Sequence, residues 1–270
     1  MELMKIASAD GTPLRVARWG ESRRDLLLVH GLAEHVGRYE HVAAALTKGG
    51  YRVTFVELRG HGESGGKPGH VSDWRRYAED LWAAARTIPD SYAIVAHSMG
   101  GLVALDALRE ALGQPVLGLA TSDPLLALAF DPPKLKLAAS RLLSRLAPSL
   151  SLANELDVKL ISRDPEVVRR YEADPLVFDT ITPRWFVESV QAQARVKEAA
   201  PRMSLPLLMM VGEADGICSP AASKELASRW GGPHALKTYP GLYHELFNEP
   251  EKETVFADLL AWLDRLPWEA

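Results

Sequence analysis

Residues 92–105, Tyr-Ala-Ile-Val-Ala-His-Ser-Met-Gly-Gly-Leu-Val-Ala-Leu, decide the fold of this chain. Their first half is an apolar run typical of a buried strand, and a helical pattern begins at Gly100. Between them lies a small–x–Ser–x–Gly turn, which exposes a serine hydroxyl above a sheet and needs small neighbours because strand and helix approach closely. Ala96 stands where glycine is commoner, and we expect its extra methyl group to be tolerated. The turn predicts that Ser98 is a nucleophile, with an ordinary helix N-cap as the alternative.

The rest of the chain alternates between short apolar runs and helical patterns. The predicted strands are residues 4–8, 14–19, 25–29, 52–57, 92–96, 116–121, 207–211 and 236–239. The predicted helices are residues 38–48, 72–87, 100–111, 220–229 and 251–266. This alternation predicts an α/β fold: a mostly parallel eight-stranded sheet with helices on both faces. The first two strands are too close in sequence to enclose a helix, so they should form an antiparallel hairpin at one edge.

Residues 123–183 interrupt the alternation with helical patterns and no convincing strand. We expect a helical cap inserted there, with residues 1–122 and 184–270 forming the core. Apolar side chains of this segment are expected to roof the site, namely Leu125, Leu126, Leu128, Phe130, Leu142, Leu143, Leu146 and Leu150. A helix over residues 133–148 carries cations and no acid: Lys134, Lys136, Arg141 and Arg145. It is either a lid helix packed on the domain or one whose cationic face also meets a lipid or micelle surface.

An activated serine needs a base within hydrogen-bond reach and an acid that orients the base. His244 lies in a loop after the last strand, at the carboxyl end of the sheet, and is the expected base. Asp215 is the first suitable loop carboxylate after the strand at residues 207–211, with Glu213 as the competitor. Cys218 is interpreted as a small buried residue near the site, because a second nucleophile would need a histidine of its own.

The tetrahedral intermediate of acyl transfer needs preorganised N–H donors for its oxyanion. Met99, directly after the nucleophile, should supply one donor. Leu32 should supply the second, with Gly31 letting the backbone turn inward after a strand that ends in His-Gly. His30 and His35 are interpreted as scaffold or rim residues. A metal site among the histidines is disfavoured, because no pair has ligand spacing on a predicted helix.

Composition limits the class of protein. The chain has 270 residues, 47% of them hydrophobic, and a net charge of −4, which excludes dominant disorder and gives no basic footprint for nucleic acid. No apolar run approaches the length of a membrane span, and the amino-terminal residues do not resemble a signal peptide. A single cysteine cannot form an internal disulfide, so we expect a reducing, cytoplasmic location. Nothing in the sequence predicts the oligomeric state.

With these loops identified, the sequence resembles the α/β-hydrolase superfamily and, within it, the monoacylglycerol lipase and lysophospholipase branch. The matching segments are residues 30–39 (His-Gly-Leu-Ala-Glu-His-Val-Gly-Arg-Tyr), 59–64 (Arg-Gly-His-Gly-Glu-Ser), 97–101 (His-Ser-Met-Gly-Gly), 162–165 (Ser-Arg-Asp-Pro) with 174–176 (Asp-Pro-Leu), and 241–245 (Gly-Leu-Tyr-His-Glu). Two residues depart from the pattern: Ala96 replaces glycine, and Glu57 stands where the strand usually ends in aspartate.

The resemblance implies a serine hydrolase with nucleophile Ser98, acid Asp215, base His244 and oxyanion donors Leu32 and Met99. It also implies a cap over an apolar acyl tunnel, a small polar pocket for glycerol, and no metal or organic cofactor. We expect the hydrolysis of a carboxylic ester, with monoacylglycerol giving fatty acid and glycerol. Lysophospholipase or general carboxylesterase activity is the alternative, and a non-catalytic ligand receptor is disfavoured because the triad is intact. The expected partner is a small lipid ester, with no nucleic acid and with transient contact between the cap and a membrane or micelle.

Overall fold

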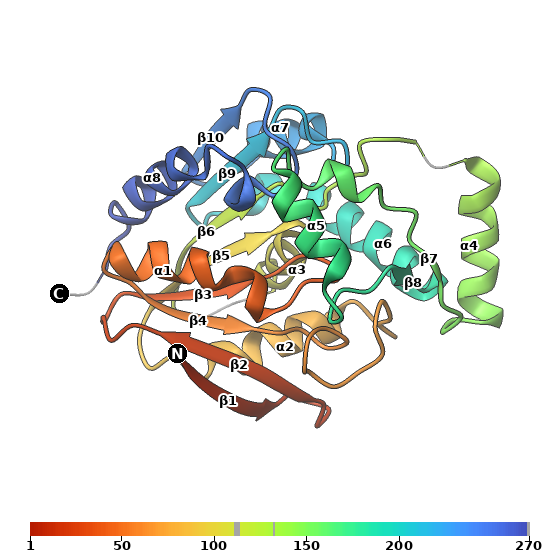
Figure 1. Ribbon diagram of the computed structural model, residues 1–270, viewed down its shortest axis with the longest axis horizontal. Coiled ribbons are helices and arrows are strands. Elements are labelled where there is room, and N and C mark those ends of the chain that lie inside the picture. Colours follow the sequence, from red (N-terminus) through yellow and green to blue (C-terminus); the bar gives the residue numbers. More distant parts are fainter. Residues whose placement is uncertain (111–113, 132, 269–270) are drawn as a thin grey trace.

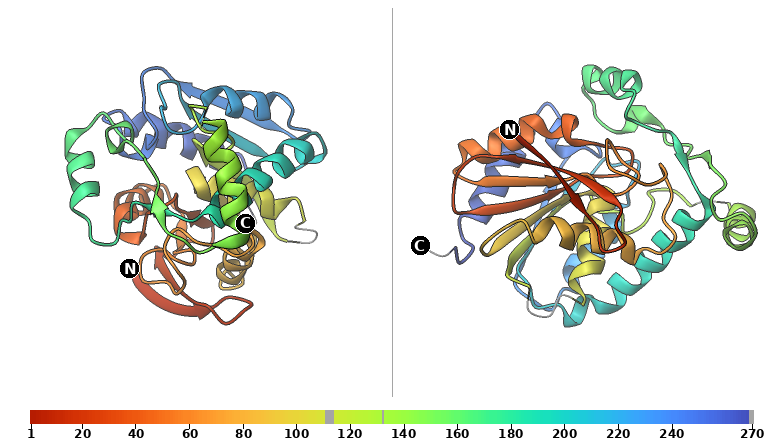
Figure 2. Two further views of the ribbon diagram at one scale, coloured as in Figure 1. Left: turned by 90° about the vertical axis from the view of Figure 1, so that its right-hand side faces the viewer. Right: turned by 90° about the horizontal axis from the view of Figure 1, so that it is seen from below.

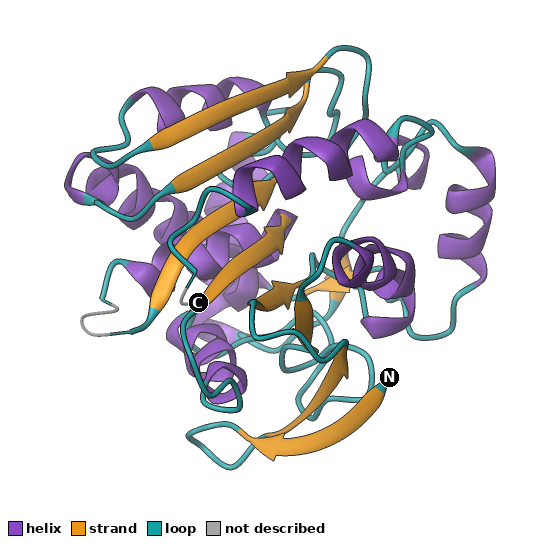
Figure 3. Ribbon diagram, turned by 90° about the vertical axis from the view of Figure 1, so that its left-hand side faces the viewer, coloured by secondary structure: helices purple, strands orange, loops and turns teal. Residues whose placement is uncertain are grey.

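A computed structural model describes residues 1–110, 114–131 and 133–268, and the side chains of Lys134 and Lys136 lie outside the described part. One eight-stranded sheet crosses the molecule in the order β1-β2-β4-β3-β5-β6-β9-β10 (Figures 1 and 3). Its strands are β1 Glu2–Ala7, β2 Pro13–Trp19, β3 Asp25–Val29, β4 Arg52–Val56, β5 Tyr92–His97, β6 Val116–Ser122, β9 Leu207–Gly212 and β10 His234–Tyr239. Only β2 runs antiparallel to its neighbours. The predicted fold class and edge hairpin are confirmed.

Helices cover both faces of the sheet. Helices α1 (Glu40–Lys48) and α8 (Lys252–Leu263) pack on one face, as do Leu26 and Leu28 of β3. The opposite face holds Leu27 and Val29 and carries four helices: α2 Arg75–Ala85, α3 Ser98–Leu108, α6 Pro183–Ala199 and α7 Pro220–Ser228. Successive side chains of a strand point to opposite faces, so a strand between two helix layers must be apolar throughout.

Helix α6 is the one long helix for which the sequence analysis gave no prediction. It begins where the Thr182 hydroxyl accepts a hydrogen bond from the backbone N–H of Trp185 at 3.2 Å, and Pro183 occupies the first helical position. A capping threonine followed by proline is a recognised helix start, so a local signal was present. A short 3₁₀ turn, η1 (Val36–Tyr39), also precedes α1.

The segment between β6 and α6 contains α4 (Lys134–Leu146), η2 (Val158–Leu160) and α5 (Pro165–Ala173). Helix α4 stands at the periphery, away from the sheet (Figures 1 and 2). The prediction of no strand in this segment was wrong, because β7 (Leu152–Ala153) pairs antiparallel with β8 (Thr180–Ile181). Two-residue strands are too short to show an alternating pattern in the sequence.

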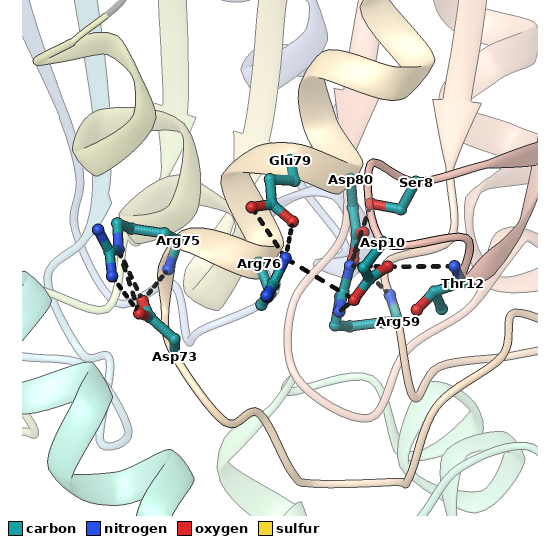
Figure 4. A network of polar contacts seen from close by, with 9 residues as sticks. All are labelled: Ser8, Asp10, Thr12, Arg59, Asp73, Arg75, Arg76, Glu79 and Asp80. Carbon is teal, nitrogen blue, oxygen red and sulfur yellow. Dashed lines mark hydrogen bonds and ion pairs between the residues drawn. The ribbon is translucent and has the colours of Figure 1, made fainter.

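The edge hairpin is fastened to the core by a buried arginine (Figure 4). Arg59 follows β4, and its guanidinium donates to Asp80 of α2 at 2.8 and 2.7 Å and to Asp10 of the β1–β2 turn at 2.7 Å. The hydrogen bond from Arg59 holds the pKa of Asp10 well below its ordinary value. The Arg-Gly-His-Gly segment therefore connects the edge strands to the helix layer.

Within the residues that the structure describes, no helix is long and apolar enough to cross a membrane.

Candidate active site

Ser98 sits on a tight turn between β5 and α3. Its backbone has φ = +51°, in the left-handed region that non-glycine residues rarely occupy. A Cβ atom at Gly100 would lie 2.4 Å from the carbonyl oxygen of His30, so this position requires glycine. Ala96, by contrast, is fully buried within β5 and paired with Val29 of β3, so its methyl group is accommodated.

Three side chains from separate loops form one hydrogen-bonded chain. His244 Nε2 lies 2.9 Å from Ser98 Oγ, and His244 Nδ1 lies 2.8 Å from Asp215 Oδ2. A carboxylate only accepts hydrogen bonds, so Nδ1 carries the proton and Nε2 can accept the serine proton. Asp215 Oδ1 accepts the backbone N–H groups of Ile217 at 2.7 Å and Cys218 at 3.0 Å, which fixes the carboxylate plane. The side chains predicted as nucleophile, acid and base therefore lie together and buried.

The competing acid lies elsewhere. Glu213 is exposed and forms an ion pair with Lys224 of α7 at 2.8 Å. The turn that follows β9 directs Glu213 to the surface and Asp215 toward His244. A strand alternates its side chains, but a turn does not, so this choice depends on loop geometry that the sequence leaves open.

The electrostatics of the base reflect a balance of two effects. Burial alone would lower the pKa of His244, but the Asp215 carboxylate outweighs it, and the pKa lies above its ordinary value of 6.5. His97 packs against the His244 ring at 4.7 Å between centroids. Burial lowers the pKa of His97 to about 4, so this neighbour stays neutral and adds no competing charge.

The two predicted oxyanion donors flank the nucleophile. Met99 is in the first turn of α3, where backbone N–H groups have no intrahelical partner. Gly31 lies against Ser98, because a Cβ there would be 3.1 Å from the Ser98 Cβ. The N–H of Gly31 is taken by Glu34 Oε2 at 2.7 Å, and among the described residues no hydrogen bond occupies the N–H of Leu32. This arrangement leaves the Leu32 and Met99 N–H groups for an oxyanion.

A buried ionic network that the sequence analysis did not single out lies behind the site. Arg38 donates to Glu34 at 3.2 Å and to Glu245 at 2.6 Å, so it joins the oxyanion loop to the residue beside the base. Tyr171 of α5 covers the guanidinium at 4.6 Å. Burial raises the pKa of Glu245 to about 7 despite Arg38. The only signal for these residues was their place in the Glu-His-Val-Gly-Arg-Tyr and His-Glu segments.

The remaining histidines near the site have structural contacts. His30 Nε2 accepts the N–H of Leu58 at 3.0 Å, and burial lowers the pKa of His30. His35 Nε2 lies 2.8 Å from Asp174, beyond the end of α5. Glu57, longer by one methylene than the usual aspartate, accepts the N–H of Val36 at 3.0 Å and so holds the oxyanion loop.

Cys218 lies beside the triad, with Sγ 4.0 Å from Ser98 Oγ. Ligand atoms of Asp215, Cys218 and His244 all lie within 4.8 Å of one another. Burial raises the pKa of Cys218 well above its ordinary value, so its sulfur is a thiol. A thiol is a poor nucleophile.

Comparison with known proteins agrees with this geometry. The profile of the family described as serine aminopeptidase, S33, matches residues 20–251. A monoacylglycerol lipase from Mycolicibacterium smegmatis is 35% identical over 250 residues, covering 90% of this chain and 89% of that protein. Phospholipase YtpA from Bacillus subtilis is 29% identical over 249 residues, covering 89% of this chain and 95% of that protein. The crystal structure of a Paleococcus ferrophilus monoacylglycerol lipase superposes with a TM-score of 0.87 at 32% identity, covering 97% of this chain and 98% of that one.

This chain matches nearly the full length of the monoacylglycerol lipases from Mycolicibacterium smegmatis and Paleococcus ferrophilus, and it shares the fold of the latter. The chain therefore belongs to the serine aminopeptidase S33 family of α/β-hydrolases, within its monoacylglycerol lipase branch, and is a carboxylic ester hydrolase.

Proposed function

We propose that the enzyme hydrolyses monoacylglycerol to fatty acid and glycerol through an acyl-enzyme on Ser98. The observation that carries this proposal is the unbroken chain of hydrogen bonds from Asp215 through His244 to Ser98, at 2.8 and 2.9 Å. Serine, histidine and aspartate in this order of contact generate a nucleophile that none of them provides alone.

In the first half-reaction, His244 Nε2 takes the hydroxyl proton as Ser98 Oγ attacks the ester carbonyl. The N–H groups of Leu32 and Met99 stabilise the oxyanion, and the Asp215 carboxylate stabilises the imidazolium. His244 then gives its proton to the departing glycerol oxygen. In the second half-reaction, His244 takes a proton from water as the water attacks the acyl-enzyme. It then gives that proton to Ser98 Oγ as the fatty acid leaves, which restores the free enzyme.

We propose that residues 123–183 form a cap above the site, on a core of residues 1–122 and 184–270. The apolar side chains of this cap suit a substrate with a single acyl chain. Leu125 and Leu126 are buried, and the N–H of Leu125 bonds to the carbonyl of Ser98 at 2.9 Å, so apolar side chains lie beside the nucleophile. A cavity of about 330 Å³ in the same segment mixes apolar walls with carboxylates; it is lined by Asn154, Leu156, Val158, Tyr171, Glu172, Asp174, Val177, Phe178 and Asp179. Apolar and polar surfaces together suit an amphiphile.

The expectation that the whole segment roofs the site was wrong for its outer part. Phe130, Leu142, Leu146 and Leu150 are exposed by 55%, 58%, 74% and 44%, and Leu135 by 82%. We propose that these residues contact a membrane or micelle from which the substrate enters. Leu135, Leu142 and Leu146 are spaced by two turns and one turn of α4, so they share one face, and the side chains of Arg141 and Arg145 are also exposed. Helix α4 also packs on α6, where Arg184 donates to the Ser144 carbonyl at 2.9 Å, which supports its interpretation as a lid helix packed on the domain.

Initial rates on a matched series test the substrate class. A covered apolar site should cleave monoolein much faster than triolein, and octanoyl or dodecanoyl esters faster than acetate, because each buried methylene contributes about 0.8 kcal/mol. Comparable rates on triolein and monoolein, or a preference for acetate, would contradict the proposal and leave a general carboxylesterase. A higher rate on lysophosphatidylcholine than on monoolein would favour the lysophospholipase alternative, which the named phospholipase relative supports.

A further inference from the structure

Asp123 is a buried acid next to the site that the mechanism does not use. It follows β6 directly, with 1% of its surface exposed and φ = +43°. Its backbone N–H donates to the carbonyl of Met210 in β9 at 3.0 Å, and its Oδ1 accepts the N–H of Gly212 at 2.9 Å. Across the described residues, Oδ2 has no hydrogen-bond partner. An unpaired carboxylate in such a position is costly, so a special reason for this acid is required.

Asp123 is tied to the loop that carries the catalytic acid. Gly212 donates its N–H to Asp123, and its carbonyl oxygen accepts the N–H of Asp215 at 3.2 Å. The chain after Asp123 then runs along this same loop: Ala129 N–H donates to the Ile217 carbonyl, and Ser219 N–H donates to the Ala127 carbonyl, both at 2.9 Å. The two acids therefore lie at the carboxyl ends of neighbouring parallel strands, and backbone hydrogen bonds fix their relative position.

The groups that face Asp123 are acidic or neutral. Burial raises the pKa of Asp123 well above its ordinary value, and the negative charges of Asp215 and, more weakly, Glu249 raise it further. Cys218 and Tyr239 also lie within electrostatic range, and burial keeps both uncharged. Among the described residues, no lysine or arginine forms an ion pair with Asp123.

We propose that Asp123 is a second acid of the active site, able to supply the negative charge beside His244 when Asp215 cannot. This inference rests on the proposed function, because it concerns the charge that stabilises the His244 imidazolium. Asp123 is a positioning residue in the intact enzyme. It acts through its hydrogen bond to the Gly212 N–H.

Removing the charge of Asp215 should make the residual activity depend on Asp123. In an Asp215→Asn variant, the neighbouring negative charge that disfavours ionisation of Asp123 is gone, so Asp123 ionises at lower pH. Its charge then stabilises the His244 imidazolium, because the protein interior screens charges poorly. The residual activity of Asp215→Asn should therefore rise above neutral pH and should depend on Asp123.

The experiment is a double-mutant cycle over pH with Asp123→Asn, Asp215→Asn and the combined variant. Asparagine keeps an oxygen for the Gly212 N–H and tolerates positive φ, so Asp123→Asn should fold, and its cost in the parent is the reference for the cycle. In the Asp215→Asn background, the same change should cost at least about tenfold and abolish the rise with pH. Glu213→Gln in that background is the control, because this exposed carboxylate on the same loop should have no effect. The Asp215→Asn change puts an asparagine directly before Gly216, a pair that can deamidate, so mass spectrometry of each preparation must show that the amide is intact.

The outcomes separate the inference from the proposed function. If Asp123→Asn costs the same factor in both backgrounds, or nothing in either, Asp123 is not a second acid and the inference is wrong. If Asp215→Asn itself loses little activity, the assignment of the triad is wrong and the proposed function falls with it. A loss from Asp123→Asn that is at least about tenfold larger in the Asp215→Asn background than in the parent supports the inference.

Discussion

At the scale of single residues, the proposed nucleophile can be removed without disturbing the turn. Ser98→Ala should abolish turnover, with a loss on the order of 10⁶-fold as for other serine triads, and should leave the unfolding temperature nearly unchanged. Cys218→Ser, whose sulfur lies 4.0 Å from Ser98 Oγ, is the control and should retain most of the activity. A Ser98→Ala enzyme that kept more than about a hundredth of the parent rate would place the nucleophile elsewhere.

The two acids that follow β9 should differ sharply. Asp215→Asn should lower kcat by roughly 10⁴-fold, because the wrong tautomer of His244 is then favoured. Glu213→Gln should have little effect, since Glu213 contacts Lys224 at the surface. Steady-state rates on a soluble short-chain ester decide between them, and the reverse ranking would move the acid to Glu213.

The state of His244 fixes the acid side of the pH profile. His244 must be neutral to accept the Ser98 proton, and Asp215 raises its pKa above 6.5. Activity should therefore fall as pH drops through a pKa above 6.5, since protonation removes the base. A profile of kcat/KM against pH measures this pKa in the free enzyme. An acid limb at or below 6.5 would mean that the Asp215 carboxylate does not dominate the environment of the base.

Individual residues also show what the sequence reveals about a site. Ser98, His244 and Asp215 were predictable because each follows a strand, and strands of a parallel sheet end at one edge. Arg38, Glu245 and Asp123 were not predictable, because their roles depend on contacts between loops far apart in the chain. No periodicity or spacing marks such contacts before the fold is known.

At the scale of elements, Arg38 should hold two loops and α5 together. Arg38→Met would leave the buried acids Glu34 and Glu245 without the cation that they share, which should destabilise the fold by about 3–5 kcal/mol. The loops that carry His244 and Leu32 should also loosen, so kcat should fall. Urea unfolding measures the stability, and Arg75→Met, at an exposed ion pair with Asp73, should leave the midpoint unchanged. Equal midpoints for both variants would contradict the role of Arg38.

The core elements followed from the sequence, and the errors lie where local signals are short. All eight strands of the main sheet were anticipated within a few residues, and the central strands β3, β5 and β9 were the plainest because they bury side chains on both faces. Strands β7 and β8 were missed because a strand of two residues is too short to show an alternating pattern. Helix α6 was missed because its only local signal is the Thr182-Pro183 pair at its start. The sequence analysis assigned too many side chains of residues 123–183 to the cover of the site, because apolar composition does not show which side of α4 contacts protein.

At the scale of the whole molecule, the exposed face of α4 should matter only when the substrate is in an aggregate. Replacing Leu135, Leu142 and Leu146 together by serine should lower the binding to phosphatidylglycerol vesicles and the rate on micellar monoolein by about tenfold or more, since three large apolar side chains lose contact with lipid. The rate on a soluble short-chain ester should not change. Undiminished vesicle binding would show that this face does not contact lipid.

Both ends of the segment between β6 and α6 are fixed to the body by backbone hydrogen bonds: Leu125 N–H to the Ser98 carbonyl, and Thr182 N–H to the Gly69 carbonyl, each at 2.9 Å. Bonds of this kind do not depend on the side chains that lie between the two anchors. The same segment is also bonded to the catalytic loops, through Ala129 N–H to the Ile217 carbonyl at 2.9 Å and Glu245 N–H to the Ile161 carbonyl at 2.8 Å. A graft from another esterase, joined at the two ends, should therefore keep Asp215 and His244 in place only if it reproduces these inner bonds.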